Sequence, residues 1–327
     1  MKAVYIANFG GPEEMSIREI AEPPAPIGRE VMVRVRAAAL NRADLLQRAG
    51  LYPPPKGFSP NVPGLEFAGD VIERGSGCRC EFASGRVMAI TGGEAQAEFI
   101  TIDERQLIEI PANLDHVQAA AVPEAFITAH DAVFSQARLE SNETLVIHAV
   151  GSGVGLAALQ MAKVSGASVI GTSRTKEKLD RCHEFGLDFP VKADNGAEVA
   201  AAIAEIAPRG ADVVLDLVGA KYFSANIRIL TPKGRLMLVG LTGGASAEID
   251  LAPILAKRLN IKGTVLRGRS PEEKAEASAL FARQFIPMFE TGQLRPNVDR
   301  VFPFSDVAEA HRYLASNKSF GKVILTF

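Results

Sequence analysis

The spacing of apolar residues changes along the chain and divides it into three regions. In the first third, apolar residues alternate with polar ones or form short runs, and Gly and Pro separate the runs. This pattern predicts β-strands at residues 2–9, 30–40, 67–75 and 85–91. The proline-rich stretches 23–28 and 52–64 are expected to be loops, because proline cannot donate a hydrogen bond to a sheet ladder.

The middle of the chain alternates between two patterns. Residues 119–134 carry apolar residues at the three- and four-residue spacing of a helix. From Thr144 onward, short β-branched runs alternate with helical segments. The predicted strands are 144–150, 167–173, 211–219, 234–241 and 260–266, with helices at 155–166 and 175–186. Strands and helices that alternate at this spacing indicate βαβ units and a parallel sheet.

The last segments resemble the β-rich first third more than the middle. They predict a long amphipathic helix at 271–294, a second helix at 304–317 and a final strand at 321–327. We therefore expect an α/β protein in which a β-rich domain is split across both ends of the chain. The expected limits are 1–123 and 267–327 for this domain, and 124–266 for a doubly wound parallel-sheet domain that binds a nucleotide.

Composition excludes several classes of partner. The 327 residues are 47% hydrophobic, and their formal net charge is -2 with no block of like charge. Neither nucleic acid nor a membrane is therefore an expected partner. No apolar run approaches the ~18 residues of a membrane span, and no signal peptide is recognisable, which favours a cytoplasmic location. The three cysteines, Cys78, Cys80 and Cys182, suit neither a disulfide framework nor a zinc ribbon and are expected to be reduced.

A glycine-rich loop follows the first strand of the middle region. Gly153, Gly155 and Ala158 fit the pattern G-x-G-x-x-A, with a predicted strand before it and a helix after it. Glycines at such a helix N-terminus let a pyrophosphate approach unpaired backbone N–H groups. The same triplet also occurs in ordinary tight turns, and the βαβ context is what favours a nucleotide.

The end of the next strand indicates which nucleotide binds. An NAD site usually has an Asp or Glu here that accepts the ribose 2′-hydroxyl. This chain instead has Thr172 and Ser173, followed by Arg174 and Lys178. Hydroxyls and cations suit a 2′-phosphate, so NADPH is the expected cofactor. The alternative is that these cations only solvate the start of a helix.

The whole chain resembles the medium-chain dehydrogenase/reductase superfamily, in its zinc-free quinone oxidoreductase branch, and within it the tumour-suppressor-inducible NADPH:quinone oxidoreductases. The segments that carry the resemblance are 37–55, 63–75, 119–134, 147–163, 212–220 and 311–325. The resemblance implies a GroES-like catalytic domain split across both ends, a Rossmann domain in the middle and an active site in the cleft between them. It also implies a homodimer.

The resemblance also bears on metal binding. Zinc-dependent relatives have a Cys and a His ligand where this chain has Asn41 and Leu65, and neither residue is suited to bind Zn²⁺. Glu66 is preserved, and we interpret it as a structural hydrogen-bonding group. We expect no metal site.

Without a metal, the protein must position the acceptor and stabilise the developing oxyanion. The resemblance places Tyr52 at the substrate, where it could stack on a quinone or bond its oxygen; a tyrosine that caps the loop is the alternative. Asn41 could bond the substrate oxygen or the nicotinamide carboxamide, or it could be a turn residue. Asp44 and Arg48 lie four apart on a predicted helix, where a local ion pair explains them at least as well as catalysis.

The resemblance assigns cofactor contacts along the chain. Thr128 is expected at the nicotinamide ribose or carboxamide, and Asn317 is expected to close over the cofactor. The remaining assigned residues are Ser152, Gly153 and Val154 at the pyrophosphate, and Val239, Gly240, Leu241, Leu266 and Arg267 along the nicotinamide. Lys192 and Ala193 stand near the point where many NADPH-dependent members carry an aromatic residue, which is a departure from the family pattern.

The expected function is therefore NADPH-dependent reduction of a small-molecule quinone. Reduction of activated C=C bonds in enones or alkenals is a close alternative, because the same hydride geometry serves both. Two further alternatives are an S-adenosylmethionine-type methyltransferase and a low-turnover NADPH-binding protein. The five histidines are scattered, and His148 is expected to be buried with its hydrogen bonds satisfied.

Overall fold

The protein forms two compact units. The computed structural model describes residues 1–327; unit 1 consists of Met1–Ile127 and Leu266–Phe327, and unit 2 of Thr128–Val265. The first unit is β-rich and split across both ends of the chain, and the second contains a parallel sheet, so the predicted fold class is confirmed.

Unit 1 contains a mostly antiparallel seven-stranded sheet, ordered β14-β15-β3-β4-β5-β7 with β6 also paired to β3, and a small β1-β2 sheet. Its strands are β1 (Lys2–Ile6), β2 (Met15–Glu19), β3 (Glu30–Leu40), β4 (Glu66–Arg74), β5 (Arg86–Ile90), β6 (Phe99–Asp103), β7 (Ile108–Glu109), β14 (Val298–Pro303) and β15 (Lys322–Thr326). Its α-helices are α1 (Arg42–Arg48), α2 (His116–Ala120), α9 (Pro271–Glu290) and α10 (Val307–Ala315).

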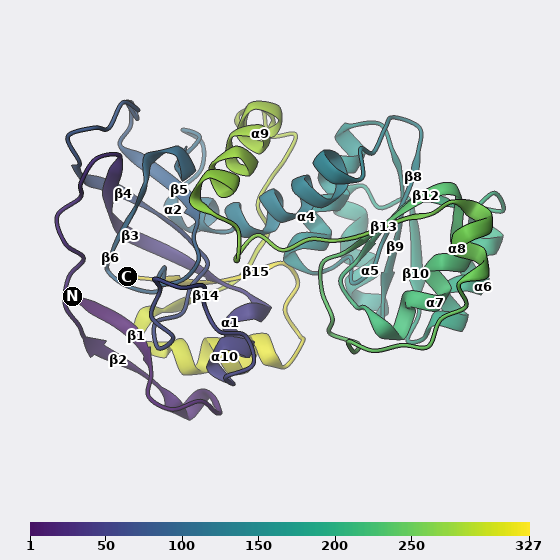
Figure 1. Cartoon of the computed structure of the whole chain (residues 1–327), viewed down its shortest axis with the longest axis horizontal. Helices are drawn as coiled ribbons and strands as arrows, with labels where there is room; N and C mark the ends of the chain where they lie inside the picture. Colours follow the sequence, from purple (N-terminus) through teal and green to yellow (C-terminus); the bar gives the residue numbers. More distant parts are fainter. The chain divides into compact units, whose positions relative to one another are not determined.

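The returning C-terminal segment completes the sheet of unit 1. Strand β15 lies antiparallel beside β3, with Val323 opposite Leu40, and parallel to β14 on its other side (Figure 1). Both strands of this junction are almost wholly buried, because β3 carries an apolar run at this end and β15 reads as Val-Ile-Leu. The first and last parts of the chain therefore share one hydrophobic core.

The predicted helical stretch at 119–134 is helical, but much of it is not α-helix. The backbone is wound as π-helix over Pro123–Ile127 and Asp131–Gln136, on either side of the short α3 (Thr128–His130). Pro123 has no N–H to donate to an α-helical ladder, and further on the N–H of Ala137 reaches back five residues to the carbonyl of Ala132, at 3.0 Å. Such wide turns are rare and frequently accompany functional sites.

Unit 2 contains a six-stranded parallel sheet in the order β10-β9-β8-β11-β12-β13. Its strands are β8 (Thr144–Ile147), β9 (Ser168–Ser173), β10 (Phe189–Lys192), β11 (Ala211–Asp216), β12 (Leu230–Leu238) and β13 (Asn260–Gly263). Its longer helices are α4 (Gly153–Val164), α5 (Lys176–Cys182), α6 (Gly196–Ile206), α7 (Ala220–Ile229) and α8 (Ala252–Lys257). The order reverses beside β8, as in doubly wound nucleotide-binding domains.

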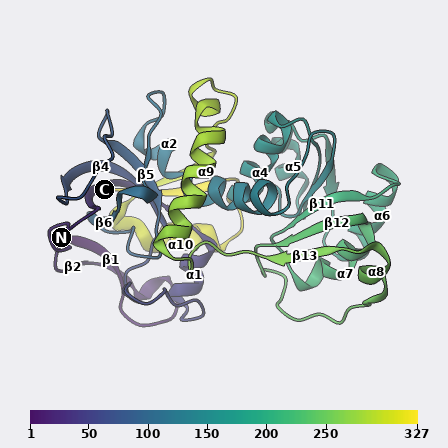
Figure 2. The same cartoon turned by 45° about the horizontal axis from the view of Figure 1, so that its top comes forward.

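Helices cover both faces of this parallel sheet. Helices α4 and α5 lie on one side and α6, α7 and α8 on the other, as both views show (Figures 1 and 2). Apolar side chains from α6 and α7 pack with Val146, Ile170 and Val214 of the central strands. None of the helices in the structure is long and apolar enough to cross a membrane.

Candidate functional site

The glycine-rich loop of unit 2 lies between β8 and the start of α4, after a strand and before a helix as predicted. Strand β8 ends at Ile147, and Ser152 caps the helix, with its Oγ accepting a hydrogen bond from the N–H of Gly155 at 3.1 Å. A Cβ at Gly155 would lie 2.6 Å from the carbonyl oxygen of Val150, so a larger residue would push the loop away from the helix. The N–H groups of Gly153 and Val154, at the first two helical positions, have no partner within the helix and can receive an anion.

The C-terminal end of β9 carries hydroxyl groups and cations. Ser173 is the last residue of β9, and its pairing partner Lys192 is the last residue of β10. The side chains of Arg174 and Lys192 are exposed and form no ion pair in the structure. Lys178 lies further along, on helix α5, and is partly buried. Arg174 and Lys192 therefore place two cations without an ion-pair partner at this edge of the sheet.

A buried hydrogen-bond network lies behind the cradle. His148 Nδ1 lies 3.0 Å from Thr172 Oγ1, and His148 Nε2 lies 2.7 Å from Asn226 Oδ1. Asn226 in turn donates to Asp216 Oδ2 at 2.9 Å. His148 directly follows β8 rather than lying within it, and the prediction that it is buried with its bonds satisfied is confirmed.

This network ties together the ends of β8, β9 and β11. Asp216 Oδ1 also accepts the N–H groups of Val218 and Gly219, at 2.7 and 2.9 Å. Burial lowers the pKa of His148 and raises that of Asp216. The neutral imidazole can both donate and accept, which suits it to hold Thr172 and Asn226 at once. The sequence did not reveal the roles of Asp216 and Asn226, since their partners lie in other elements.

The other predicted cofactor contacts of unit 2 lie in separate segments. Val239 and Gly240 follow β12, and their N–H groups bond the carbonyl of Asp216 at 2.9 and 3.3 Å. Leu241 is 56% exposed and lines a cavity of about 200 Å³. Thr128 is buried, and its Oγ1 has no hydrogen-bond partner in the protein. A buried hydroxyl without a partner is costly, which makes Thr128 a candidate ligand contact.

A buried ion pair dominates the polar interior of unit 1. Lys322 Nζ lies 2.5 Å from Glu66 Oε1, and the two side chains are 6% and 0% exposed. Asn41 joins both of them: its Nδ2 donates to Glu66 Oε1 at 2.9 Å, and its Oδ1 accepts from Lys322 Nζ at 2.7 Å. The interpretation of Glu66 as a structural hydrogen-bonding group agrees with these contacts. A direct bond from Asn41 to a substrate stays a prediction, and both amide atoms already have partners in this triad.

The predicted ion pair between Asp44 and Arg48 is wrong. Asp44 is fully buried, and its carboxylate accepts the backbone N–H groups of Asn41 and Gly64, at 2.6 and 3.1 Å. Arg48 instead donates to the carbonyl of Gly10 at 3.1 Å and contacts His311 Nδ1 at 3.3 Å. The N–H at the start of α1 and that of Gly64 thus satisfy the carboxylate in place of the Arg48 guanidinium. Burial raises the pKa of Asp44 to about 6, although the hydrogen bond from the Asn41 N–H lowers it in part.

Arg267 is buried in unit 1 and holds Tyr52 in place. Its Nε donates to the carbonyl of Gly92 and its Nη1 to the carbonyl of Tyr52, both at 2.9 Å, and its Nη2 bonds Gln47 Oε1. The guanidinium also lies 4.9 Å from the centre of the Tyr52 ring. The structure thus brings Tyr52 and Arg267 together, and Leu266 beside Arg267 is buried. Burial raises the pKa of Tyr52 above its usual value of 10.

Asn317 lies apart from this cluster, just after α10. Its backbone has a φ of +59°, a left-handed conformation that asparagine tolerates better than most residues. Its Oδ1 accepts a hydrogen bond from Arg42 Nη2 at 2.6 Å.

The sequence did not reveal the importance of Glu124. This residue lies in the π-helical turn Pro123–Ile127, and its backbone N–H donates to Glu66 Oε2 at 2.7 Å. Burial and then the neighbouring Glu66 carboxylate raise the pKa of Glu124 to about 8. In the sequence, Glu124 is a single acid within an apolar helical stretch. Such acids are common, so the pattern does not indicate a functional residue.

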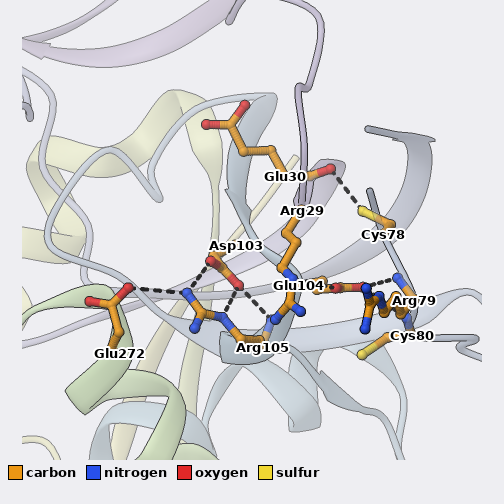
Figure 3. A network of polar contacts seen from close by, with 9 residues as sticks. All are labelled: Arg29, Glu30, Cys78, Arg79, Cys80, Asp103, Glu104, Arg105 and Glu272. Atoms are coloured by element: carbon orange, nitrogen blue, oxygen red, sulfur yellow. Dashed lines mark hydrogen bonds and ion pairs between the residues drawn. The ribbon is translucent and has the colours of Figure 1, made fainter. Parts of the chain in front are cut away.

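A second polar network in unit 1 surrounds the C-x-C pair (Figure 3). Glu104 is 2% exposed and accepts the N–H groups of Arg79 and Cys80, each at 2.7 Å, while Arg105 joins Asp103 to Glu272. Burial and Glu104 raise the pKa values of the Cys78 and Cys80 thiols. A raised pKa leaves less of each thiol in the nucleophilic thiolate form near neutral pH.

Metal ligands are not grouped in the structure. No set of three or more His, Cys, Asp or Glu side chains lies together in an arrangement that could hold a metal ion. The prediction of zinc-independent chemistry rests on Asn41 and Leu65. Leu65 is buried, and its side chain has no atom that could bind a metal ion.

Comparison with known proteins covers both units. Residues 28–112 match the family model of the alcohol dehydrogenase GroES-like domain, and residues 153–283 match that of the zinc-binding dehydrogenases. The chain is 31% identical to a quinone oxidoreductase of Pseudomonas aeruginosa, and the match covers 99% of both proteins. The solved structure of an NAD-dependent alcohol dehydrogenase is 30% identical with a TM-score of 0.86, and it covers 100% of both chains. The JamJ enoyl reductase structure is 25% identical with a TM-score of 0.85, and it covers 99% of this chain and 98% of that one.

The buried ion pair allows a test of what stabilises unit 1. Replacing Lys322 by Met leaves Glu66 charged and buried without its cation, and we expect a loss of about 3–5 kcal/mol in the free energy of unfolding. Urea unfolding followed by circular dichroism measures this loss, since the chain has no tryptophan. Lys318→Met, at an exposed position, is the matched control. The double variant Glu66→Gln/Lys322→Met should regain much of the loss; equal stability of all variants would contradict this role.

Proposed function

Because the chain belongs to the medium-chain dehydrogenase/reductase superfamily, we propose that it is a zinc-independent NADPH:quinone reductase. Oxidoreductases of this family use a nicotinamide cofactor, and quinone oxidoreductases are among the relatives of this chain along its full length. The observation that carries the NADPH assignment is the end of β9, where Ser173, Arg174 and Lys192 stand and no carboxylate is present.

The residues of unit 2 fit a dinucleotide. The N–H groups of Gly153 and Val154, next to Ser152, would hold the pyrophosphate, because Gly155 allows the backbone to approach it closely. Thr128 has an unpaired buried hydroxyl that the nicotinamide end of the cofactor would satisfy. The other proposed contacts are Lys178, Val239, Gly240 and Leu241 in unit 2, and Leu266, Arg267 and Asn317 in unit 1.

Quinone reduction places modest demands on the protein. The bound cofactor supplies the hydride, and the quinone ring accepts it readily because the product is aromatic. The protein has to orient the acceptor and stabilise an oxyanion. Tyr52 supports this role, because Arg267 contacts its ring and its backbone carbonyl and so restricts its position. In this proposal, the Asn41–Glu66–Lys322 triad stabilises unit 1 beside these residues.

Reduction of an activated C=C bond is the second candidate function. It is supported by the similarity to an enoyl reductase structure, which nearly matches the similarity to the alcohol dehydrogenase structure. An enone accepts hydride at carbon and then needs a proton, so it depends more on an acid in the site than a quinone does.

Cofactor titration and a panel of acceptors test the proposed function. We expect NADPH to bind more tightly than NADH, with S-adenosylmethionine not binding, and we expect loss of NADPH absorbance when a quinone is added. Faster turnover of enones and alkenals would favour the second candidate. NADPH binding without turnover of any acceptor would identify a low-turnover binding protein, and preferential binding of S-adenosylmethionine would refute both reductase functions.

The preference for NADPH can be tested at Arg174. Replacing Arg174 by Ala removes a cation that would bond the 2′-phosphate, and we expect the Kd for NADPH to rise about 10-fold, since a charge-assisted hydrogen bond contributes about 1.5 kcal/mol. The Kd for NADH should stay the same, because NADH lacks that phosphate. Arg209→Ala removes an exposed arginine elsewhere in unit 2 and is the control. An equal effect on both cofactors would show that Arg174 does not select the 2′-phosphate.

We further propose that the protein is a homodimer formed through unit 2. Strand β13 is at the edge of the parallel sheet, and the segments beside it expose Leu251, Leu255 and Val265, at 59%, 78% and 54%. An unpaired strand edge with exposed apolar side chains is a ready surface for a second copy of the same chain.

Light scattering on a size-exclusion column tests this assembly. The wild type should have twice the 34.9 kDa mass of one chain, and the double variant Leu251→Glu/Leu255→Glu should have the mass of one. Phe9→Glu, at a residue of unit 1 that is 59% exposed, should leave the mass unchanged. A monomeric wild type would refute the proposal.

A further inference from the structure

Three acids of unit 1, Glu66, Asp44 and Glu124, interact electrostatically around Lys322 and Arg267, and they differ in what their carboxyl groups contact. Glu66 uses both oxygens, one for Lys322 and Asn41 and the other for the N–H of Glu124. Asp44 is fully buried, and its two oxygens accept backbone N–H groups. All four oxygens of these two carboxylates therefore already accept hydrogen bonds from the protein.

Glu124 differs from both. It is partly exposed, and its carboxyl group takes no hydrogen bond from another residue of the protein. Its main chain is nevertheless fixed, because its N–H bonds Glu66. The carboxyl group is thus positioned by its backbone, and its oxygens remain available. We propose that Glu124 is the acid that protonates the reduced acceptor, an inference that rests on the proposed reductase function.

The charges around Glu124 favour its protonated form. Glu66 and Asp44 act on it as negative groups, while Lys322 and Arg267 act as positive ones. Lys274 of α9 and Tyr52 also interact with it electrostatically. Lys322 is already paired to Glu66, and burial disfavours a further negative charge. The pKa of Glu124 is therefore raised to about 8, and the group keeps its proton below that pH.

Tyr52 is the other candidate acid of this cluster. Burial raises the pKa of Tyr52 above its usual value of 10, whereas the pKa of Glu124 is about 8, so Glu124 is the stronger acid of the two. A general acid works best when its pKa is close to the working pH, which also favours Glu124. Tyr52 can still donate a hydrogen bond that orients the acceptor.

The proton transfer balances the reduction. Hydride transfer gives the acceptor two electrons and one hydrogen, oxidises the nicotinamide and leaves a negative charge on the reduced acceptor. The O–H bond of Glu124 then breaks, and its proton bonds to the hydroquinone oxygen or to the enolate. The carboxylate that remains takes a new proton from solvent, to which Glu124 is partly exposed.

The variant Glu124→Gln tests this role with two kinds of acceptor. With an enone, which must be protonated, we expect kcat/KM to fall about 100-fold, in line with the loss of a general acid. With tetrachloro-1,4-benzoquinone, whose hydroquinone is acidic enough to leave as an anion, we expect little change. Glu205→Gln, at an exposed position on α6, is the matched control.

The pH dependence separates an acid from a structural residue. For the wild type with the enone, kcat/KM should fall as the pH rises through about 8, because only protonated Glu124 is active. The Gln variant should lose this fall and stay low throughout. An unchanged rate and pH profile in Glu124→Gln would overturn the inference while leaving the reductase function intact. An equal loss with both acceptors would also overturn it, by showing a structural effect. If the wild type reduces no acceptor at all, the proposed function itself fails.

Discussion

The ion pair between Glu66 and Lys322 is the interaction on which unit 1 depends. It joins residues 256 positions apart in the sequence, and it lies where the last strand of the chain returns beside β3. Two charges buried this deeply are costly unless each finds its partner, so the pair favours one register of β15 and disfavours others. Asn41 bonds both members of the pair and completes the triad. The N–H of Glu124 donates to the other carboxylate oxygen of Glu66. The position of the proposed acid therefore follows from the same interaction that closes the split unit.

Unit 2 achieves order in a different way. Its parallel strands end at one edge of the sheet. Three of these ends are joined by a buried hydrogen-bond network, which consists of His148, Thr172, Asn226 and Asp216. A buried hydrogen-bond network holds its side chains rigidly when every polar group in it has a partner, because no group is then buried without a hydrogen bond. The glycine loop is built on this support, so its N–H groups are held in place before any anion binds.

Much of both units was predictable because their signals are local. The alternation of strands and helices after Thr144 predicted the parallel sheet, and the G-x-G-x-x-A pattern predicted the cradle at α4. Predictions from sequence spacing failed where a side chain could choose between several hydrogen-bonding partners. Asp44 and Arg48 have the helical spacing of an ion pair, but backbone N–H groups bind the carboxylate instead. Similarly, the helical stretch that begins at Pro123 is wound as a π-helical turn, which its apolar spacing did not indicate.

The sequence by itself determined the fold class, the order of the elements and the position of the glycine-rich loop, because each depends on residues within a few turns of one another. It also indicated zinc-independent chemistry, since Asn41 and Leu65 are poor ligands wherever they lie. Only the tertiary structure singled out Glu124 as the proposed acid. Glu124 becomes distinctive because it is only partly buried, because the Glu66 carboxylate lies near it and because its own carboxyl group has no hydrogen-bond partner. Those conditions arise from segments that are distant in sequence, and electrostatic effects of this kind depend on distance in space.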